Sequence, residues 1–423
     1  MIFNKNKNKK IIQKKIIYNG AWLYLLQIFN TVVPLLTIPY ITRVLNKEQY
    51  GKFSIALNLI GYFEVIIEYG FSMSATRKLT LIGKNKDRIN RLLTTVLYSR
   101  FILFSISISL LQLYMIIFEF DGIEKKCIYL LSLSLVGGCF QQNWLYQGLQ
   151  EMKYISLINI LARGISTILI FILVKSPNDL FLYCILYSSV SMIAGLGGFI
   201  FAFIKYQIRV VGIKIKNILY ELKDGWYVFT TQLSSKIFGS IGITLLGIFG
   251  TSSDVGELSV LQKIPNILIL IWAPIGQVLY PIVSQNFNES VSNGKKFVMS
   301  CKKVILPIFI LLTIVGICFS KRIVLIVFGE NYLDSYFWII PLFMWVVIAI
   351  NNNFLGIQTL LASGHDKEYS KCFQIGVFCT IILNFILVII FKGMGAAIAP
   401  LLSELVLTYL LSIETLKVFK EKN

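Results

Sequence analysis

Three basic side chains lie deep inside long apolar stretches: Arg163, Lys236 and Lys263. A cation at the centre of a bilayer costs about 2.5–3.5 kcal/mol on insertion scales, so each should face the protein interior and have a partner. Such a cation can bind a diphosphate or a sugar acid, and an arginine can do so through two hydrogen bonds. Alternatively, each pairs with an intramembrane acid and fixes helix packing. Arg100, near the end of its stretch, is expected to extend toward the interface instead.

Two carboxylates, Glu64 and Glu68, are four residues apart and therefore share one face of a helix. Two like charges at membrane depth disfavour each other's ionisation, so one of them can hold a proton. This spacing suggests a coupling site for H⁺ or Na⁺. The alternatives are ion pairing with Arg163 or Lys236, or simple exposure of the two carboxylates to a water-filled cavity. A third acid, Glu404, lies in a later apolar stretch.

Residues for catalysis are sparse. His365 is the only histidine, and it is accompanied by no phosphate-binding loop, nucleophile elbow or zinc spacing. The seven cysteines form no C-x-x-C pair, which argues against a metal site or a disulfide framework. We therefore expect no enzyme activity, no cofactor, no metal and no ATP-driven step.

The elements that must position these residues are membrane helices. The composition is 56% hydrophobic and 14% charged, with a mean hydropathy of +0.73, so too few polar side chains are present to cover a surface that faces water. Stretches of this length satisfy their backbone groups inside lipid only as helices. The expected fold is an all-α membrane protein with spans near 17–40, 53–75, 92–118, 127–147, 155–174, 180–204, 225–250, 256–283, 304–328, 336–361, 372–391 and 395–416.

The basic residues give these twelve spans an orientation. The N-terminal tail and every second loop carry about three times as many Lys and Arg residues as the other loops, which predicts cytoplasmic N- and C-termini. The same bias accounts for the net charge of +19 as a fringe that faces anionic membrane lipids. Nucleic-acid binding is not indicated.

The spans divide into two halves of six. Tyr50-Gly51-x-x-Ser54 opens the second span, and Val255-Gly256-x-x-Ser259 opens the eighth, which suggests a duplicated architecture with a pathway between the repeats. We expect two six-helix lobes around a central cavity. The predicted segments are a basic cytoplasmic tail (1–16), an N-terminal lobe (17–204), a cytoplasmic loop between the lobes (205–224), a C-terminal lobe (225–416) and a cytoplasmic tail (417–423).

Several short motifs lie within these spans or at their ends. They include Pro39-Tyr40-x-x-Arg43, Trp144-x-x-Gln147-Gly148, Gln262-Lys263-Ile264 and Gly395-Ala396-Ala397. Together they resemble the polysaccharide-biosynthesis flippases, which move lipid-linked repeat units of O-antigen, capsule or similar glycans. This family belongs to a superfamily with MATE-type multidrug exporters and lipid II flippases.

The resemblance implies an alternating-access flippase in the bacterial cytoplasmic membrane. Its implied substrate is an undecaprenyl-diphosphate oligosaccharide, and a polysaccharide polymerase is an implied partner. Asn19 and Trp22, at the cytoplasmic mouth of the first span, match a family pattern and are candidates for substrate contact. Trp144, near a cytoplasmic helix end, is expected in the interfacial aromatic belt.

Two other functions compete with this one. An ion-coupled multidrug exporter has the same architecture, although a strongly cationic cavity would repel cationic drugs. An integral-membrane glycan ligase or polymerase should present a sizeable outer loop with acids, Arg or His, and the predicted outer loops are short.

Overall fold

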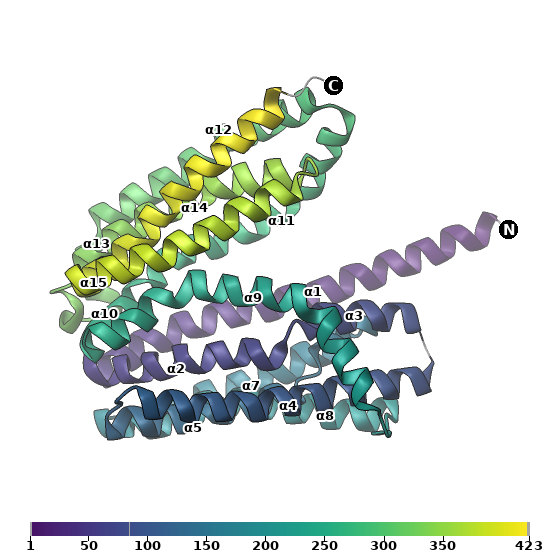
Figure 1. Ribbon diagram of the computed structural model, residues 1–423, viewed down its shortest axis with the longest axis horizontal. Coiled ribbons are helices and arrows are strands. Elements are labelled where there is room, and N and C mark those ends of the chain that lie inside the picture. The colour runs from purple at the N-terminus through teal and green to yellow at the C-terminus, as the bar shows by residue number, and fades with distance from the viewer. Residues whose placement is uncertain (1, 84, 421–423) are drawn as a thin grey trace. The chain divides into compact units, whose positions relative to one another are not determined.

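The computed structural model describes residues 2–83 and 85–420, with side chains from residue 18 onward, and the regular structure in these ranges is helical throughout (Figure 1). Ten helices are long and apolar enough to cross a membrane. One of them, α15 (Asp366–Lys420), is two helices joined at Lys392, whose dihedral angles are not helical (φ 49°, ψ −126°). The apolar helix α5 (Gly122–Phe140) adds another segment. The predicted all-α membrane class is therefore confirmed, with the twelve segments that it requires.

The chain separates into two compact units. The first unit comprises Met1–Val44 and Ala56–Lys236, and the second comprises Leu45–Ile55 and Ile237–Asn423. The boundary lies inside α9 (Ile215–Phe249), and the start of α2 (Lys47–Glu68) belongs to the second unit. The lobes expected over 17–204 and 225–416 remain a prediction.

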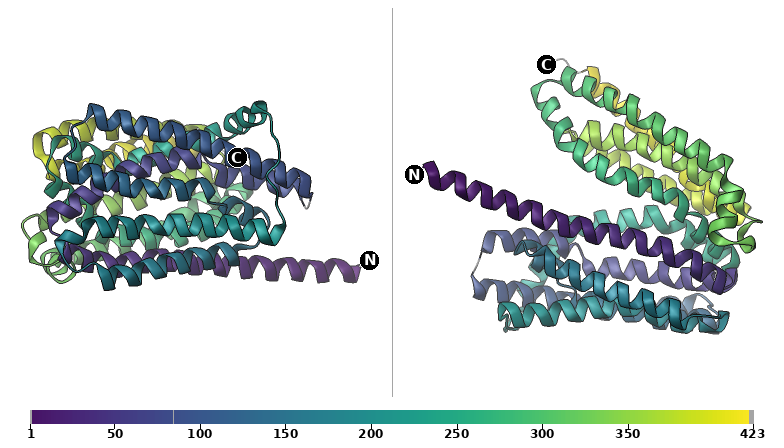
Figure 2. Two further views of the ribbon diagram at one scale, coloured as in Figure 1. Left: turned by 90° about the horizontal axis from the view of Figure 1, so that it is seen from below. Right: turned by 180° about the vertical axis from the view of Figure 1, so that it is seen from behind.

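Helices make up the first unit, and most of them are long and packed side by side (Figures 1 and 2). Besides α2, α5 and α9, they are α1 (Ile2–Val44), α3 (Phe71–Ile82), α4 (Lys86–Ile117), α6 (Asn143–Gly148), α7 (Met152–Leu173) and α8 (Leu180–Tyr206), with a 3-10 turn at Pro177–Asp179. Helix α8 packs on both α5 and α7, and α7 packs on α1. A Cβ atom on Gly195 of α8 would lie 2.1 Å from the Gly137 carbonyl oxygen of α5, so this crossing requires small residues.

The second expected span, 53–75, is not one continuous helix. It breaks between α2 and α3 at Tyr69 and Gly70, which have positive φ angles of 47° and 76°. The Ser72 N–H, in the first turn of α3, donates to Glu68 Oε1 at 2.6 Å. A carboxylate that accepts from a backbone N–H of a first turn stabilises the new helix start.

Trp144 is not in the interfacial belt, and the sequence-based expectation was wrong. Helix α5 ends before it, and the short helix α6 packs on α3 instead of continuing α5. Trp144 is consequently 0% exposed, in an apolar core with Phe71, Leu79 and Tyr146. The reason is the chain reversal after α5, which the apolar content of this segment does not reveal.

The second unit contains the remaining helices and a second core. They are α10 (Ser252–Leu261), α11 (Lys263–Glu289), α12 (Val291–Cys318), α13 (Ser320–Phe328), α14 (Ile339–Leu355) and α15, with 3-10 turns at Glu330–Tyr332 and Tyr336–Trp338 and a π-helical turn η4 at Gly356–Leu361. Helix α14 packs on α15 and α12, and α11 packs on α12. Trp272 of α11 anchors this core, with its ring centroid 5.1 Å from that of Phe354 and 6.1 Å from that of Phe309.

The two repeated motifs meet each other inside the second unit. A Cβ atom on Gly51 would lie 1.6 Å from the Ser252 carbonyl oxygen, and one on Gly256 would lie 2.2 Å from the Lys47 carbonyl oxygen. Gly51 thus faces Ser252, four residues before Gly256, and Gly256 faces Lys47, four residues before Gly51. The start of α2 and the start of α10 therefore cross with approximate twofold symmetry, at a separation that leaves no room for a side chain on either glycine.

Candidate functional site

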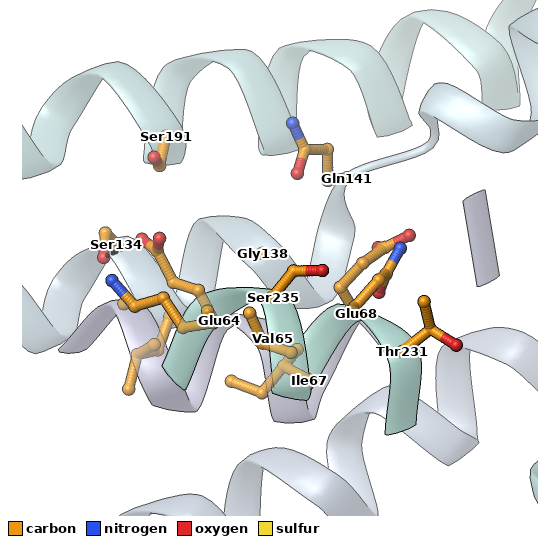
Figure 3. Close-up of a pocket in the computed structure, with 14 residues that line it drawn as sticks. Glu64, Val65, Ile67, Glu68, Ser134, Gly138, Gln141, Ser191, Thr231 and Ser235 are labelled. Atoms are coloured by element: carbon orange, nitrogen blue, oxygen red, sulfur yellow. Dashed lines mark hydrogen bonds between the residues drawn. The ribbon is translucent and has the colours of Figure 1, made fainter. Parts of the chain in front are cut away.

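A polar cavity in the first unit has a volume of about 680 Å³. Its walls come from α2, α5, α8 and α9 (Figure 3). The residues that line it are Gly61, Glu64, Val65, Ile67, Glu68, Ser134, Leu135, Gly138, Gln141, Ser191, Thr231, Gln232, Ser235 and Lys236. Three of the residues singled out in the sequence, Glu64, Glu68 and Lys236, therefore come together here.

Lys236 projects from α9 toward α2. Its Nζ lies 3.5 Å from Asn58 Oδ1 and 5.2 Å from the centroid of the Tyr62 ring. A Cβ atom on Gly61 would lie 2.7 Å from the same Nζ, so the absence of a side chain at Gly61 provides the space for the ammonium group. An amide oxygen and an aromatic face both stabilise a cation that is removed from bulk water.

Glu64 faces the cavity and is within electrostatic reach of Lys236. Its Oε1 accepts a hydrogen bond of 2.8 Å from the Ser134 hydroxyl of α5. Opposite charges on α2 and α9 thus face one cavity, and a hydroxyl orients the carboxylate. Figure 3 shows Glu64 and Ser134 beside each other at one end of the cavity.

Glu68 has a different role from Glu64, although both are on one face of α2. It forms an ion pair with Arg100 of α4, in addition to accepting from the Ser72 N–H. The side chain of Arg100 is 2% exposed, and its guanidinium also donates to the Gln141 carbonyl oxygen. The expectation that Arg100 extends toward the interface was therefore wrong. A buried guanidinium requires a counter-charge and acceptors, and the fold supplies both.

Arg163 is not among the residues that line this cavity. Its Nη1 lies 3.5 Å from the Asn30 carbonyl oxygen, which places it between α7 and α1. Tyr187 of α8 is within electrostatic reach of both Arg163 and Glu64. Arg163 thus lies outside the lining of this cavity, and its predicted contact with substrate stays a prediction.

Asn19 and Trp22 lie near the turn that joins α6 and α7. The Asn19 amide donates to the Gln150 carbonyl oxygen at 2.8 Å and accepts from the Met152 N–H at 3.4 Å. Gln150 has a positive φ of 57°, so Asn19 holds a strained turn in place. Trp22 packs edge-on against Tyr18 with ring centroids 6.3 Å apart. Substrate contact by Asn19 and Trp22 stays a prediction.

Lys263 lies in the second unit, at the junction of α10 and α11. Its side chain is exposed. The neighbouring Gln262, Pro265 and Asn266 line a pocket of about 160 Å³ in this unit, whereas Lys263 is not part of that lining. Its predicted role in a cavity stays a prediction.

The described part of the chain contains no group of three or more His, Cys, Asp or Glu side chains that could hold a metal ion. Sequence reasoning had missed the uncharged half of the cavity: Ser134, Gln141, Ser191, Thr231, Gln232 and Ser235. In the sequence they stand out only as polar residues inside apolar stretches. That signal is ambiguous, because a hydroxyl that hydrogen-bonds to the backbone of its own helix looks the same. The fold was needed to bring them together.

Comparisons with known proteins agree on one family. The model of the family described as "Polysaccharide biosynthesis protein" matches residues 16–287. The "Putative O-antigen transporter" of Escherichia coli is 27% identical over 412 residues, which cover 96% of this chain and 97% of that protein. The "Probable low-salt glycan biosynthesis flippase" of Haloferax volcanii is 24% identical over 397 residues, covering 92% and 81%.

Two solved structures share the fold. The lipid II flippase MurJ in its inward closed conformation aligns with a TM-score of 0.71 at 15% identity, covering 95% of this chain and 89% of MurJ. A multidrug resistance MATE family transporter in an inward-facing conformation aligns with a TM-score of 0.65 at 13% identity, covering 93% of this chain and 100% of the transporter.

Proposed function

Because this chain belongs to the polysaccharide biosynthesis protein family, we propose that it is a flippase for a lipid-linked oligosaccharide. In this proposal, it moves an undecaprenyl-diphosphate repeat unit from the cytoplasmic to the outer leaflet of a bacterial cytoplasmic membrane by alternating access. It catalyses no bond change. The names of its relatives, which are transporters and flippases of glycan pathways, support this function.

The observation that carries the proposal is the polar cavity at membrane depth. An oligosaccharide headgroup carries many hydroxyls, and each polar group left unpaired in hydrocarbon costs several kcal/mol. Hydroxyl and amide side chains both donate and accept hydrogen bonds, so they can replace the water around a sugar. Six such side chains line the first-unit cavity on α5, α8, α9 and the residue after α5: Ser134, Gln141, Ser191, Thr231, Gln232 and Ser235.

The charges in the cavity refine the expected substrate contacts. Arg100 compensates Glu68, which leaves Lys236 and Glu64 as the opposed pair that faces the space. The cavity is thus mixed in charge rather than strongly cationic. Lys236 is the group suited to a diphosphate or a sugar acid, and the uncharged side chains are suited to hydroxyls.

Ion coupling is part of the proposal, with Glu64 as its site in the first unit. Glu68 is occupied by Arg100 and the start of α3, whereas Glu64 accepts from the Ser134 hydroxyl and faces Lys236 across the cavity. A carboxylate in this position can exchange H⁺ or Na⁺ when the substrate engages Lys236. Glu64→Gln should therefore remove the dependence of transport on an ion gradient, and normal gradient dependence would dismiss this coupling site.

The test of the substrate site is removal of the Lys236 charge. Lys236→Ala should abolish glycan export without loss of protein from the membrane, and Lys236→Arg should retain some export. Lys214→Ala, an exposed lysine before α9, serves as the matched control. Export is measured as surface polysaccharide in cells and as translocation of a fluorescent undecaprenyl-diphosphate glycan in proteoliposomes.

The same proteoliposomes distinguish the flippase from the alternative functions. Normal glycan translocation by Lys236→Ala would reject the substrate site. A wild-type protein that moves cationic dyes against a gradient but leaves the lipid-linked glycan in place would instead be a multidrug exporter. A glycan ligase or polymerase would change the length of the glycan, which gel electrophoresis reads directly.

The orientation and location complete the proposal. Cysteines introduced into the loops 77–91 and 205–223 should react with a membrane-impermeant thiol reagent only from the cytoplasmic side, and those in 42–52 only from outside. This pattern corresponds to cytoplasmic N- and C-termini. A glycan polymerase that consumes the translocated unit is the proposed functional partner.

A further inference from the structure

Glu404 is a buried acid in the second unit that the proposed substrate site does not use. It lies in the second half of α15, about 16 Å along the helix from Gly393 at a rise of about 1.5 Å per residue. Its residue is 6% exposed. A carboxylate in the middle of a membrane span is costly unless it is paired or neutralised by a proton.

The hydrogen bonds around Glu404 define its chemistry. One Asn352 amide atom lies 2.5 Å from Glu404 Oε2 and 2.9 Å from the Glu404 carbonyl oxygen. Because a backbone carbonyl only accepts, the Asn352 atom that faces both must be the nitrogen. The Thr408 hydroxyl lies 2.7 Å from Asn352 Oδ1 and 2.8 Å from the Glu404 carbonyl oxygen and can donate to either, which is consistent with this orientation of the amide. Oε2 is therefore an acceptor, and an acidic proton belongs on Oε1.

In the described part of the chain, Glu404 has no basic partner. Within the ranges that the structure describes, no Lys, Arg or His side chain forms an ion pair with it. The elements packed against this part of α15 are α10, α12, α14, the turns at 336–338 and 356–361, and the first half of α15. Their titratable groups are Asp254, Glu257, Lys295, Lys296, Cys301, Lys302, Lys303, Cys318, Tyr336, Asp366, Lys367, Glu368, Tyr369, Lys371, Cys372, Cys379 and Lys392. Of these, the phenol of Tyr369 is within electrostatic reach of Glu404, and Glu257 is occupied by Lys47 at 2.6 Å.

A small pocket adjoins the acid. It has a volume of about 160 Å³ and includes Pro400 and Trp345 in its lining, together with the polar side chains of Gln262 and Asn266. Pro400 precedes Glu404 by four residues and so lies on the same face of α15. Trp345 lies beside the Glu404 carboxyl, so its buried indole N–H is a donor within reach of that carboxyl.

From this geometry, we propose that Glu404 is a proton-binding site of the second unit, which exchanges its proton with water in the adjoining pocket. The Trp345 N–H and the Asn352 amide provide donors for the carboxylate once the proton has left. A proton fits better than Na⁺, because an N–H group occupies Oε2 and no other Asp or Glu side chain of the described residues acts on this carboxyl. A contribution of this proton to transport rests on the flippase function proposed above, whereas the binding site itself does not.

The test is infrared difference spectroscopy of the full-length protein in lipid nanodiscs at neutral pH. The wild type should show a neutral carboxyl stretch that shifts in D₂O, and Glu404→Gln should lose it. Glu404→Asp should retain a neutral acid at a shifted frequency. Glu414→Gln is the matched control on the same helix, because Glu414 is paired with Lys417 at 2.7 Å and should contribute no such band.

Each result decides the question. An unchanged neutral-carboxyl spectrum in Glu404→Gln would overturn the proton site whether or not the protein moves glycans. Loss of the band supports the site. A proteoliposome assay then asks whether Glu404→Gln loses the stimulation of glycan translocation by a pH gradient, and absent translocation in the wild type would count against the flippase function alone. If Glu404→Gln does not fold, the band shift in Glu404→Asp provides the same decision.

Discussion

The Arg100–Glu68 pair predicts that its two members differ in their effect on stability. The side chain of Arg100 is 2% exposed, whereas that of Glu68 is 29% exposed toward the cavity. Without Glu68, the guanidinium stays buried with its charge uncompensated. Without Arg100, the carboxylate still accepts from the Ser72 N–H and can reach water. Neutralising Glu68 should therefore destabilise the protein more than neutralising Arg100.

The magnitude follows from this asymmetry. Removing the partner of a buried charge lowers the free energy of unfolding by about 3–5 kcal/mol, and we expect this loss for Glu68→Gln. Arg100→Met leaves the Gln141 carbonyl and Glu68 to be hydrated from the cavity, at a cost of about 1–3 kcal/mol. At about 2–4 °C per kcal/mol for a unit of this size, Glu68→Gln should lower the Tm by roughly 6–20 °C.

The assay is thermal unfolding of purified protein in nanodiscs, followed by tryptophan fluorescence. The double variant Glu68→Gln/Arg100→Met removes both charges and should be more stable than Glu68→Gln alone. Glu330→Gln, an exposed acid outside the spans, is the control. An Arg100→Met variant that is less stable than Glu68→Gln would falsify the burial argument, as would a double variant whose loss is the sum of the two.

Two further predictions concern packing. Gly51→Ala should destabilise the protein by at least about 1–3 kcal/mol, because its methyl group would lie 1.6 Å from the Ser252 carbonyl oxygen, whereas Gly20→Ala meets nothing within 4 Å and should be neutral or stabilising. Equal Tm values for these two alanine variants would contradict the close crossing of α2 and α10. Asn19→Ala should cost about 1–2 kcal/mol, because the amide bridges two backbone groups of the turn before α7. An unchanged Tm would show that Asn19 does not hold that turn.

The twelve segments were readable from the sequence because the bilayer imposes a length and a composition on every helix that crosses it. Lys236 and Glu64 were found for the same reason, since a charge inside an apolar stretch is costly enough to signal a purpose. The structure places both side chains in one cavity of the first unit.

The helix break at Tyr69 and Gly70 could not be predicted from the sequence, because the apolar pattern continues across it and a single glycine does not indicate the start of a new helix. The different roles of Glu64 and Glu68 were hidden by their equal spacing on α2. Trp144 was misplaced because an aromatic residue near a span end suits both a membrane belt and a buried core.

The sequence by itself determined that the protein lies in lipid, that it is helical and which residues carry a charge inside a span. These properties follow from the free energy of transfer from water to lipid, which is a property of each residue type. Only the tertiary structure decided which acid is compensated, which asparagine orients a carboxyl and which hydroxyls share a cavity. Those outcomes depend on partners such as Arg100 and Glu68, 32 residues apart, or Asn352 and Glu404, 52 apart. Contacts over such separations are set by helix packing, and no local pattern encodes them.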